Sequence, residues 1–482
     1  MKLRELLENV NVMETNVDLD MEICCVSSDT RKDMGKGGLF VALSGFAFDG
    51  NRFIPMALEK GAAVVVTAKK PEQEVPYVLV DNDRLALARI GANFYGHPSK
   101  AMTMIGVTGT NGKTSTTLLV KHILEKALGA KVGLIGTMEN RIGHEVLDTD
   151  RTTPESIQLQ ELFAKMRDAG CQYVVMEVSS HAIALHRVEG IHFAVGAFTN
   201  LTEDHLDFHK TMDAYGKTKA QLFAHCDKAV TNADSEWGQP MVAKCPGNVV
   251  SVALDGCGDL MAKNVVYHGN GVQFTVVCGE ESENVEVPIP GRFTVYNVLT
   301  AMGVARQLGV SLPDAAQALR DMQGVKGRVE VVPTPGKEYT VLIDYAHTPD
   351  GLENVLSSVR SFCKGRLIVV FGCGGDRDRT KRPIMGEIGV RLSDLAVITS
   401  DNPRTEEPAA IIQDIVAGVG DARNYVVVEN RKKAIHYAMD IGEKNDMIVL
   451  AGKGHETYQE IMGEKYHMDE REIVAQYLAE SR

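Results

Sequence analysis

The sequence lacks the features of a membrane or secreted protein. None of its apolar runs is long enough for a membrane span, and residues 1–5 lead into no apolar core of the kind that a signal peptide carries. Its nine cysteines form no CxxC pair, so their spacing does not indicate a zinc or redox site. Scattered cysteines in an odd number are typical of free thiols, and we therefore expect a cytoplasmic protein without a membrane span.

The chain also lacks an excess of basic residues. With 51 lysines and arginines against 64 aspartates and glutamates, its formal net charge at pH 7 is −13. A general nucleic-acid surface needs the opposite balance, so we expect no nucleic-acid partner. An anionic ligand would have to be held by local lysines and arginines, by Mg²⁺ or by helix N-termini.

The most informative segment is 105–117, which reads IGVTGTNGKTSTT. A short apolar run at 102–107 leads into a glycine-rich turn and then into a helical pattern that reaches about residue 128. In this setting backbone N–H groups and a helix N-terminus bind phosphates, Lys113 reaches the β- and γ-phosphates, and the Thr114 hydroxyl faces Mg²⁺. Val107 stands where a strict P-loop has its first glycine, which leaves an ordinary αβ turn as the alternative. Gly-Lys-Thr after an apolar strand favours an ATP-type phosphate site formed by Gly109, Thr110, Asn111, Gly112, Lys113, Thr114 and Ser115.

A chain of 482 residues is too long for one hydrophobic core, and its pattern predicts three α/β domains. Residues 1–100 predict a small α/β domain that ends at YGHPSK. Residues 101–330 alternate strands and helices, which predicts a central parallel-sheet ATPase domain, with an antiparallel hairpin that turns at 269–271. Residues 331–482 resume the alternation and predict a Rossmann-like domain. The predicted strands are 102–107, 131–137, 173–178 and 193–199 in the central domain, and 366–371, 395–399, 425–429 and 447–450 in the last.

Two motifs of the central domain carry groups that can bind metal. Glu177 ends a predicted strand next to the P-loop strand, where a carboxylate is a natural Mg²⁺ ligand, although a helix-capping role is the alternative. His205 and His209 have the spacing of a helical zinc pair, but no third ligand follows at a characteristic distance. A polar loop with one histidine facing an active-site metal is therefore favoured. Lys219, in YGKTK, would by itself be read as a surface lysine.

Four polar clusters follow predicted strands of the last domain: DYAHTPD at 344–350, GCGGDRDR at 372–379, DNPR at 401–404 and GKGHE at 452–456. The carboxyl ends of parallel strands meet at one sheet edge, so the clusters predict one cleft. Arg377 and Arg404 suit a carboxylate, because a guanidinium binds it through two parallel hydrogen bonds. Glu456 suits an ammonium group. Together these side chains are complementary to an amino acid.

Eight motifs occur in a fixed order over nearly the whole chain: GTNGKT, MEVSSHA, NLTEDHLDFH, YGKTK, DYAHTPD, GCGGDRDRTKRP, DNPRTEEP and GKGHE. This combination resembles the Mur ligases, in which DNPR is associated with diaminopimelate rather than lysine. The resemblance implies an ATP-dependent amide-forming ligase of peptidoglycan precursor synthesis. Its substrates would be ATP, meso-2,6-diaminopimelate and the D-glutamate γ-carboxylate of UDP-N-acetylmuramoyl-L-alanyl-D-glutamate, with an acyl phosphate intermediate and two Mg²⁺ ions. We expect a monomer.

The resemblance also implies roles for individual residues. The catalytic residues would be Lys113, Glu177, His205 and Lys219; the Mg²⁺ ligands would be Thr114, Glu177, His205 and Lys219, the last of these as a carbamylated lysine (N6-carboxylysine). ATP would contact Asn297, Arg328, Asp344 and His347 besides the P-loop. The UDP-muramoyl-dipeptide would contact Thr30, Thr152, Thr153, Ser179 and Arg187, and diaminopimelate would contact Arg377, Asp401, Asn402, Pro403, Arg404, Gly452 and Glu456.

Three alternatives remain at this point. A lysine-adding ligase shares most motifs, but Arg404 argues against it. A folylpolyglutamate synthase shares the P-loop and the modified lysine, but the domain ahead of the P-loop argues against it. A nucleotide-dependent regulatory protein would need only the first motif and leaves the last cleft unexplained.

Overall fold

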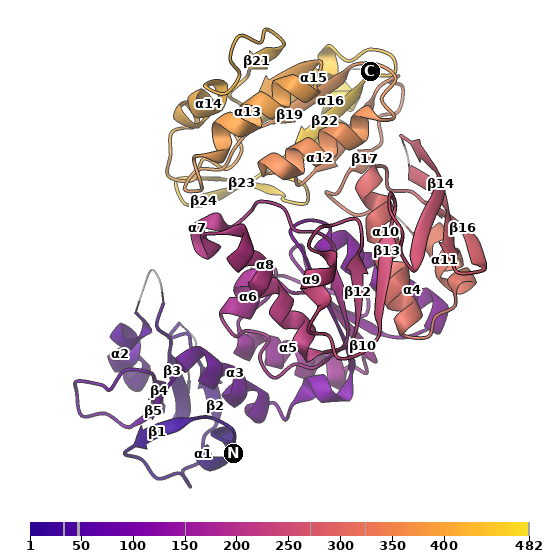
Figure 1. Cartoon of the computed structure of the whole chain (residues 1–482). Helices are drawn as coiled ribbons and strands as arrows, with labels where there is room; N and C mark the ends of the chain where they lie inside the picture. The colour runs from indigo at the N-terminus through magenta and orange to yellow at the C-terminus, as the bar shows by residue number, and fades with distance from the viewer. Residues whose placement is uncertain (32–33, 46–48, 150, 270, 323, 481–482) are drawn as a thin grey trace.

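The computed structural model describes residues 1–31, 34–45, 49–149, 151–269, 271–322 and 324–480. Three sheets follow one another along the chain, each covered by helices, and a two-stranded hairpin follows the last sheet (Figure 1). The predicted three-domain α/β architecture is therefore confirmed. Domain boundaries near residues 100 and 330 stay a proposal. No helix among the described residues is long and apolar enough to span a membrane.

The first sheet has the strand order β1-β5-β4-β3-β2. Its strands are β1 Val12–Thr15, β2 Cys25–Ser27, β3 Gly38–Ala42, β4 Ala62–Thr67 and β5 Tyr77–Val80, and its helices are α1 Leu3–Leu6, α2 Ile54–Glu59 and α3 Asp83–Phe94. Asn82 begins α3 because its side-chain oxygen accepts hydrogen bonds from the backbone N–H groups of Arg84 and Leu85. Helix α3 packs on α5 (Ser156–Asp168) of the central domain so closely that a Cβ at Gly91 would lie 3.2 Å from Ile157.

The central sheet has eleven strands in the order β16-β15-β14-β13-β12-β11-β6-β10-β7-β8-β9. They are β6 Thr103–Thr108, β7 Val132–Ile135, β8 Asn140–Ile142, β9 Glu145–Leu147, β10 Tyr173–Glu177, β11 Phe193–Phe198, β12 Cys226–Asn232, β13 Val249–Ala253, β14 Leu260–His268, β15 Gly271–Cys278 and β16 Glu281–Val287. The four predicted strands correspond to β6, β7, β10 and β11, which pair in parallel, whereas β12 was not predicted.

Helices cover both faces of the parallel part of this sheet. They are α4 Lys113–Leu128, α5 Ser156–Asp168, α6 Ser180–Ala184, α7 Leu206–His209, α8 Met212–Ala220, α9 Gly238–Val242, α10 Arg292–Gln307 and α11 Leu312–Arg320. Side chains of β6 alternate between two cores: Ile105 packs with α4 and α10, and Met104 packs with α5. This alternation explains the nearly continuous apolar run in the sequence.

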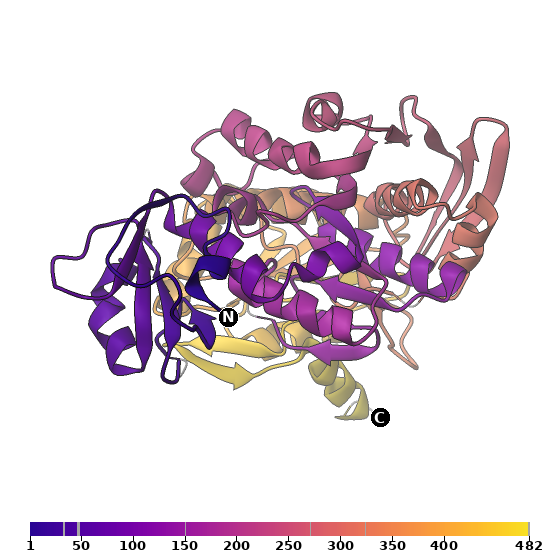
Figure 2. The ribbon, with the colours of Figure 1, turned by 90° about the horizontal axis from the view of Figure 1, so that it is seen from below.

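The predicted hairpin is confirmed as an antiparallel pair of β14 and β15, and β16 extends it to three strands. Asn270, in the predicted turn, lies outside the described residues. These strands project from the central sheet at the end far from the first domain (Figure 2).

The last sheet has the order β17-β18-β22-β19-β20-β21. Its strands are β17 Glu330–Val332, β18 Thr340–Asp344, β19 Leu367–Phe371, β20 Leu395–Ile398, β21 Tyr425–Val427 and β22 Met447–Ala451; its helices are α12 Pro349–Arg360, α13 Lys381–Leu392, α14 Pro408–Val416, α15 Arg431–Asp440 and α16 Glu470–Glu480. Val369 of β19 packs in the core that α12, α13 and α14 share, whereas Ile368 packs in the core of α15 and α16. The four predicted strands are confirmed. The hairpin of β23 Tyr458–Ile461 and β24 Glu464–His467 was not predicted.

Candidate active site

The loop between β6 and α4 has the conformation that its glycines predict. Gly109 and Gly112 have φ angles of 151° and 83°, and a Cβ at Gly109 would lie 1.9 Å from Thr199 Oγ1. Thr199, the residue after β11, donates a hydrogen bond from its hydroxyl to the carbonyl of Asn111 at 2.6 Å. Lys113 Nζ donates to the carbonyls of Gly109 and Thr110 at 3.0 and 2.7 Å. The ammonium group therefore lies over the loop, where phosphate oxygens could take the place of these carbonyls.

A cavity of about 690 Å³ opens beside this loop, and the central and last domains form it together. Of the predicted residues, its lining includes Thr110, Asn111, Gly112, Lys113, Thr114, Ser115, Thr152, Glu177, His205, Asn297, Arg328, Asp344 and His347. Asp350 of α12 accepts hydrogen bonds from the Asn111 amide and, at 2.8 Å, from Thr202 Oγ1. This contact, which the sequence did not predict, ties the last domain to the P-loop.

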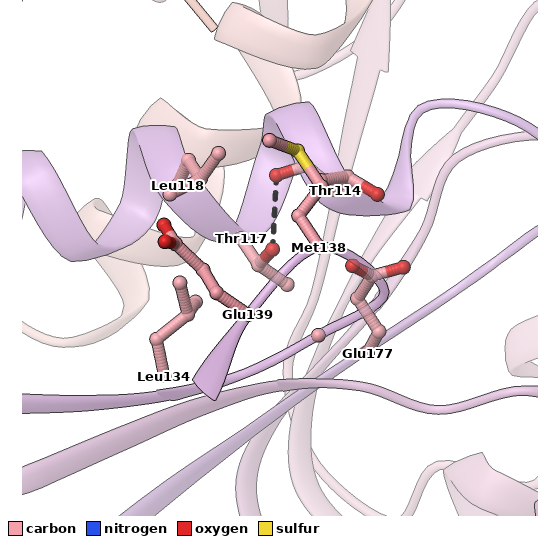
Figure 3. A pocket seen from close by; sticks show the side chains of 8 residues that line it. Thr114, Thr117, Leu118, Leu134, Met138, Glu139 and Glu177 are labelled. Atoms are coloured by element: carbon pink, nitrogen blue, oxygen red, sulfur yellow. Dashed lines mark hydrogen bonds between the residues drawn. The ribbon is translucent and has the colours of Figure 1, made fainter. Parts of the chain in front are cut away.

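Glu177 is the last residue of β10 and its side chain is fully buried. Its two carboxylate oxygens accept hydrogen bonds from the backbone N–H and the hydroxyl of Thr137, both at 2.9 Å. The carboxylate points toward the start of α4, where Thr117 Oγ1 donates to the carbonyl of Thr114 at 3.0 Å (Figure 3). A small void of about 10 Å³ separates these groups. Glu177 thus presents a fixed carboxylate to the end of the cavity that the 110–115 loop lines.

Lys219 lies in α8 with only 1% of its surface exposed. Its Nζ donates to the carbonyl of Gly109 at 2.8 Å and lies 4.6 Å from the centre of the Tyr215 ring. Burial, reinforced by the charge of Lys113, holds the pKa of Lys219 well below its ordinary value. The reading as a surface lysine is therefore wrong for Lys219, whereas Lys217 is exposed and pairs with Asp213.

The two histidines of the motif at 199–209 have different surroundings. His205 precedes α7, lines the cavity and pairs with Asp204 at 3.3 Å. His209 is buried, and its Nε2 lies 2.9 Å from Ser180 Oγ. Within the described parts of the chain, no three side chains of histidine, cysteine, aspartate and glutamate are placed to hold a metal ion. The oxygen donors Thr114 and Glu177 beside the P-loop suit Mg²⁺ that is also bound by phosphate oxygens and water.

The residues expected at the nucleotide line the same cavity as the P-loop. Asn297 of α10 lies so close to the loop that a Cβ at Gly112 would lie 2.4 Å from its Oδ1. Arg328 Nη2 donates to Thr114 Oγ1 at 3.3 Å, and its guanidinium lies 5.0 Å from the centre of the Tyr345 ring. From the last domain, Asp344 accepts from the backbone N–H of Val329 at 2.8 Å, and burial raises its pKa.

Four of the five residues expected at the UDP-muramoyl-dipeptide lie together near Glu177. Thr153 Oγ1 donates to the Glu177 carbonyl at 2.9 Å and accepts from the Ser179 N–H at 3.2 Å. Arg187 Nη1 donates to the Thr153 carbonyl at 3.1 Å. Thr152 Oγ1 lies 3.0 Å from the Thr137 hydroxyl that binds Glu177. Thr30 lies in the first domain, and no hydrogen bond within the described ranges joins it to the other four.

The four polar clusters of the last domain meet at one sheet edge, as predicted. They follow β18, β22, β19 and β20, which are parallel neighbours in this order. Asn402 Nδ2 donates to Glu456 Oε2 at 2.9 Å, which joins the DNPR and GKGHE clusters. The seven predicted diaminopimelate residues are not among the described residues that line the 690 Å³ cavity.

The two arginines of this edge differ in their contacts. Arg377 is exposed and donates to the carbonyl of Asp376 at 3.1 Å. Arg404 is held more firmly: Nη1 donates to the Gly375 carbonyl at 2.8 Å, and Nε lies 3.2 Å from Glu460. Its backbone also pairs with the end of β23. The Arg404 side chain is therefore already oriented, and some of its N–H groups already have partners.

Comparison with known proteins identifies the family. Three family models match the chain: the Mur ligase catalytic domain over residues 22–95, the Mur ligase middle domain over 107–305 and the Mur ligase glutamate ligase domain over 327–454. The chain belongs to the Mur ligase family. Relatives named UDP-N-acetylmuramoyl-L-alanyl-D-glutamate–2,6-diaminopimelate ligase are 47% identical, one from Clostridium botulinum over 95% of this chain and 96% of its own, and one from Clostridium acetobutylicum over 100% of both.

Solved structures agree with this Mur ligase architecture. A structure named UDP-N-acetylmuramoyl-L-alanyl-D-glutamate–2,6-diaminopimelate ligase superposes with a TM-score of 0.71 at 29% identity and covers 100% of this chain and 99% of its own. A Thermotoga maritima MurF ligase in complex with ADP has a TM-score of 0.66 at 18% identity, over 95% of this chain and 98% of its own. The second likeness bears on the fold alone.

Proposed function

We propose that the protein is an ATP-dependent ligase that joins meso-2,6-diaminopimelate to the D-glutamate γ-carboxylate of UDP-N-acetylmuramoyl-L-alanyl-D-glutamate. Membership of the Mur ligase family and 47% identity to relatives of this name, over nearly the whole chain, support this reaction. The observation that carries the catalytic part is one cavity whose lining includes Lys113 and Glu177 together with residues of the last domain.

The reaction has two steps. The substrate γ-carboxylate attacks the γ-phosphorus of ATP, which forms an acyl phosphate and releases ADP. The amine of diaminopimelate then attacks the acyl carbon, an amide bond forms, and phosphate leaves. Direct condensation of a carboxylate and an ammonium is uphill in water, and the acyl phosphate supplies the better leaving group. Domain closure around the cavity would keep water from hydrolysing this intermediate.

Lys113 and the P-loop N–H groups would hold the ATP phosphates and spread the charge that develops during phosphoryl transfer. Thr114, Glu177, His205 and a carbamylated Lys219 would hold two Mg²⁺ ions, which supply further neutralisation of the phosphate charge when bound. The lowered pKa of Lys219 supports the modification, because only a neutral amine adds to carbon dioxide.

Diaminopimelate would bind at the edge formed by the DNPR and GKGHE clusters. Arg377 and Arg404 would bind carboxylates of the amino acid, and Glu456 would bind an ammonium group. Thr152, Thr153, Ser179 and Arg187 would hold the dipeptide of the second substrate beside Glu177.

The test measures ATP hydrolysis and amide formation with each substrate omitted in turn. The proposal requires that both UDP-N-acetylmuramoyl-L-alanyl-D-glutamate and diaminopimelate be present for product to form. Equal turnover with lysine would indicate a lysine-adding or unselective ligase. Hydrolysis that needs neither substrate would favour a nucleotide-dependent regulatory protein.

A further inference from the structure

Lys453 is a fully buried lysine at the amino-acid edge of the last domain. It lies in the GKGHE cluster after β22, and its side chain has no exposed surface. Its Nζ donates two hydrogen bonds of 2.9 Å, one to Asn402 Oδ1 and one to Glu456 Oε2. Both acceptors belong to the proposed diaminopimelate site, and the lysine lies between them.

The lysine determines which way the Asn402 amide faces. Lys453 Nζ and the backbone N–H of Glu460, both 2.9 Å from the same atom of Asn402, can only donate. That atom must therefore be the amide oxygen. The Asn402 NH₂ group consequently points the other way and donates to Glu456 Oε2.

Glu456 thereby has one oxygen committed and one oxygen available. Oε2 accepts from both Lys453 and Asn402, whereas Oε1 receives no hydrogen bond from the described residues. A carboxylate that is held through one oxygen presents the other in a fixed direction. Oε1 is thus the atom placed to receive an ammonium group.

Lys453 also acts on the electrostatics of the edge. Burial alone would raise the pKa of Asp401, but the charges of Lys453 and Arg431 hold it below its ordinary value. Without Lys453, the carboxylates of Asp401, after β20, and Glu456, after β22, would lose a shared buried cation. Such a loss weakens the orientation of every group that the cation holds.

We propose that Lys453 is a positioning residue for the amino-acid substrate, which fixes Asn402 and Glu456 so that Glu456 Oε1 faces the ammonium group of diaminopimelate. This inference rests on the proposed function. Lys453 is not among the described residues that line the 690 Å³ cavity, and its hydrogen bonds go to Asn402 and Glu456. We therefore expect its effect to be selective for one of the three substrates.

The test compares steady-state kinetics of Lys453→Met, Lys453→Arg and the wild type in the full-length enzyme. Lys453→Met removes the charge at similar length and is expected to raise KM for diaminopimelate about 10- to 100-fold, the usual range for hydrogen bonds to charged groups. KM for ATP and for the UDP-linked dipeptide should change less than about twofold. Lys453→Arg keeps the buried charge but not the donor geometry, and its KM for diaminopimelate should lie between the other two.

Lys444→Met is the matched control, because Lys444 is an exposed lysine of the same domain that pairs with Glu338. It should leave all three KM values unchanged. A second comparison places Lys453→Met in the Glu456→Gln background. If Lys453 acts through Glu456, the second change should raise KM for diaminopimelate much less there than in the wild type.

Equal rises in all three KM values, or no rise for diaminopimelate, would overturn the inference. If Lys453→Met does not fold, Lys453→Arg decides by the same criterion: an unchanged KM for diaminopimelate contradicts the proposed role. Failure of the wild type to use diaminopimelate would overturn the proposed function and this inference together. If the wild type uses diaminopimelate but the Lys453 variants keep its KM for diaminopimelate, this inference alone would be overturned.

Discussion

Lys219 Nζ donates a hydrogen bond to the carbonyl of Gly109, so a buried lysine of α8 contacts the turn that is expected to hold the ATP phosphates. The distance is 2.8 Å, and Lys113 binds the same carbonyl at 3.0 Å. Burial lowers the pKa of Lys219, and the positive charge of Lys113 on the same oxygen lowers it further. Conversion of Lys219 to a carbamate would replace this repulsion by attraction to Lys113 and to Mg²⁺.

Substitution of Lys219 by alanine is therefore expected to abolish nearly all ligation. A short-chain carboxylate added to Lys219→Ala should restore part of the activity, because it can occupy the place of the carbamate. Intact-mass measurement should find one added carbon dioxide on the wild type. Lys217→Ala is the control, since Lys217 is exposed, and it should keep full activity. An active enzyme with an unmodified Lys219 would contradict the prediction.

Loss of charge stabilisation at the phosphates should affect the first chemical step. Lys113→Ala, Glu177→Gln and His205→Ala are each expected to slow acyl-phosphate formation by about 10²–10³-fold, the range found when one stabilising group is removed from a transition state. Rapid-quench measurement of ADP formation from ATP and the UDP-linked dipeptide, with diaminopimelate left out, reports this step. Glu145→Gln, on the exposed β9, is the control. Loss of bound zinc from His205→Ala would instead support the histidine-pair reading.

Some features of this site could be predicted from the sequence because local patterns determine them. The apolar run at 102–107, the glycines and Gly-Lys-Thr together determine the turn and the start of α4 at Lys113. The four strand-end clusters were predicted to meet because parallel strands align their carboxyl ends. The register of β18, β22, β19 and β20 bears this out.

Other features depend on contacts between distant segments. The β23–β24 hairpin is short and its side chains are half-buried or exposed, so no alternating apolar pattern marks it. Burial of Lys219 and Lys453 was not predicted, because their partners Gly109 and Asn402 are more than 50 residues away in the sequence. Asp350 belongs to the DYAHTPD motif, but its contact with Asn111 depends on how two domains pack.

Stability in acid should depend on Glu406, which binds the fully buried Arg382. Hydrogen bonds from Arg382 lower the pKa of Glu406 to about 2, below its ordinary value near 4.5. Because the folded-state pKa is the lower one, the stabilisation is complete above the unfolded pKa and disappears as the pH falls through the folded pKa. The melting temperature should therefore decrease between about pH 5 and pH 2.

Glu406→Gln tests this dependence. The variant should be less stable at pH 7, because Asp414 is then the one charged partner of Arg382 that remains among the described residues. Its melting temperature should also fall less steeply in acid. Glu387→Gln is the control, because Glu387 forms an exposed ion pair with Arg391 on α13. If the melting temperatures of Glu406→Gln and the wild type fall equally between about pH 5 and pH 2, Glu406 is not the source of this pH dependence.

Amino-acid choice should depend on Arg404. Diaminopimelate differs from lysine by one additional carboxylate, and the guanidinium N–H groups placed for that carboxylate would be left unpaired when lysine binds. Sites built around a polar group of the substrate typically reject analogues without it by about 10⁴-fold or more, and we expect a preference for diaminopimelate of at least about 10³-fold. Arg404 donates to the Gly375 carbonyl and pairs with Glu460, so its side chain is already oriented before the amino acid arrives.

Arg404→Ala should therefore reduce kcat/KM for diaminopimelate far more than for lysine and leave KM for ATP unchanged. Arg391→Ala, which removes an exposed arginine of α13, should leave the preference as it is. If Arg404→Ala keeps the ratio of the two kcat/KM values, Arg404 serves only to fix the loop against β23, and selection must come from another group at this edge.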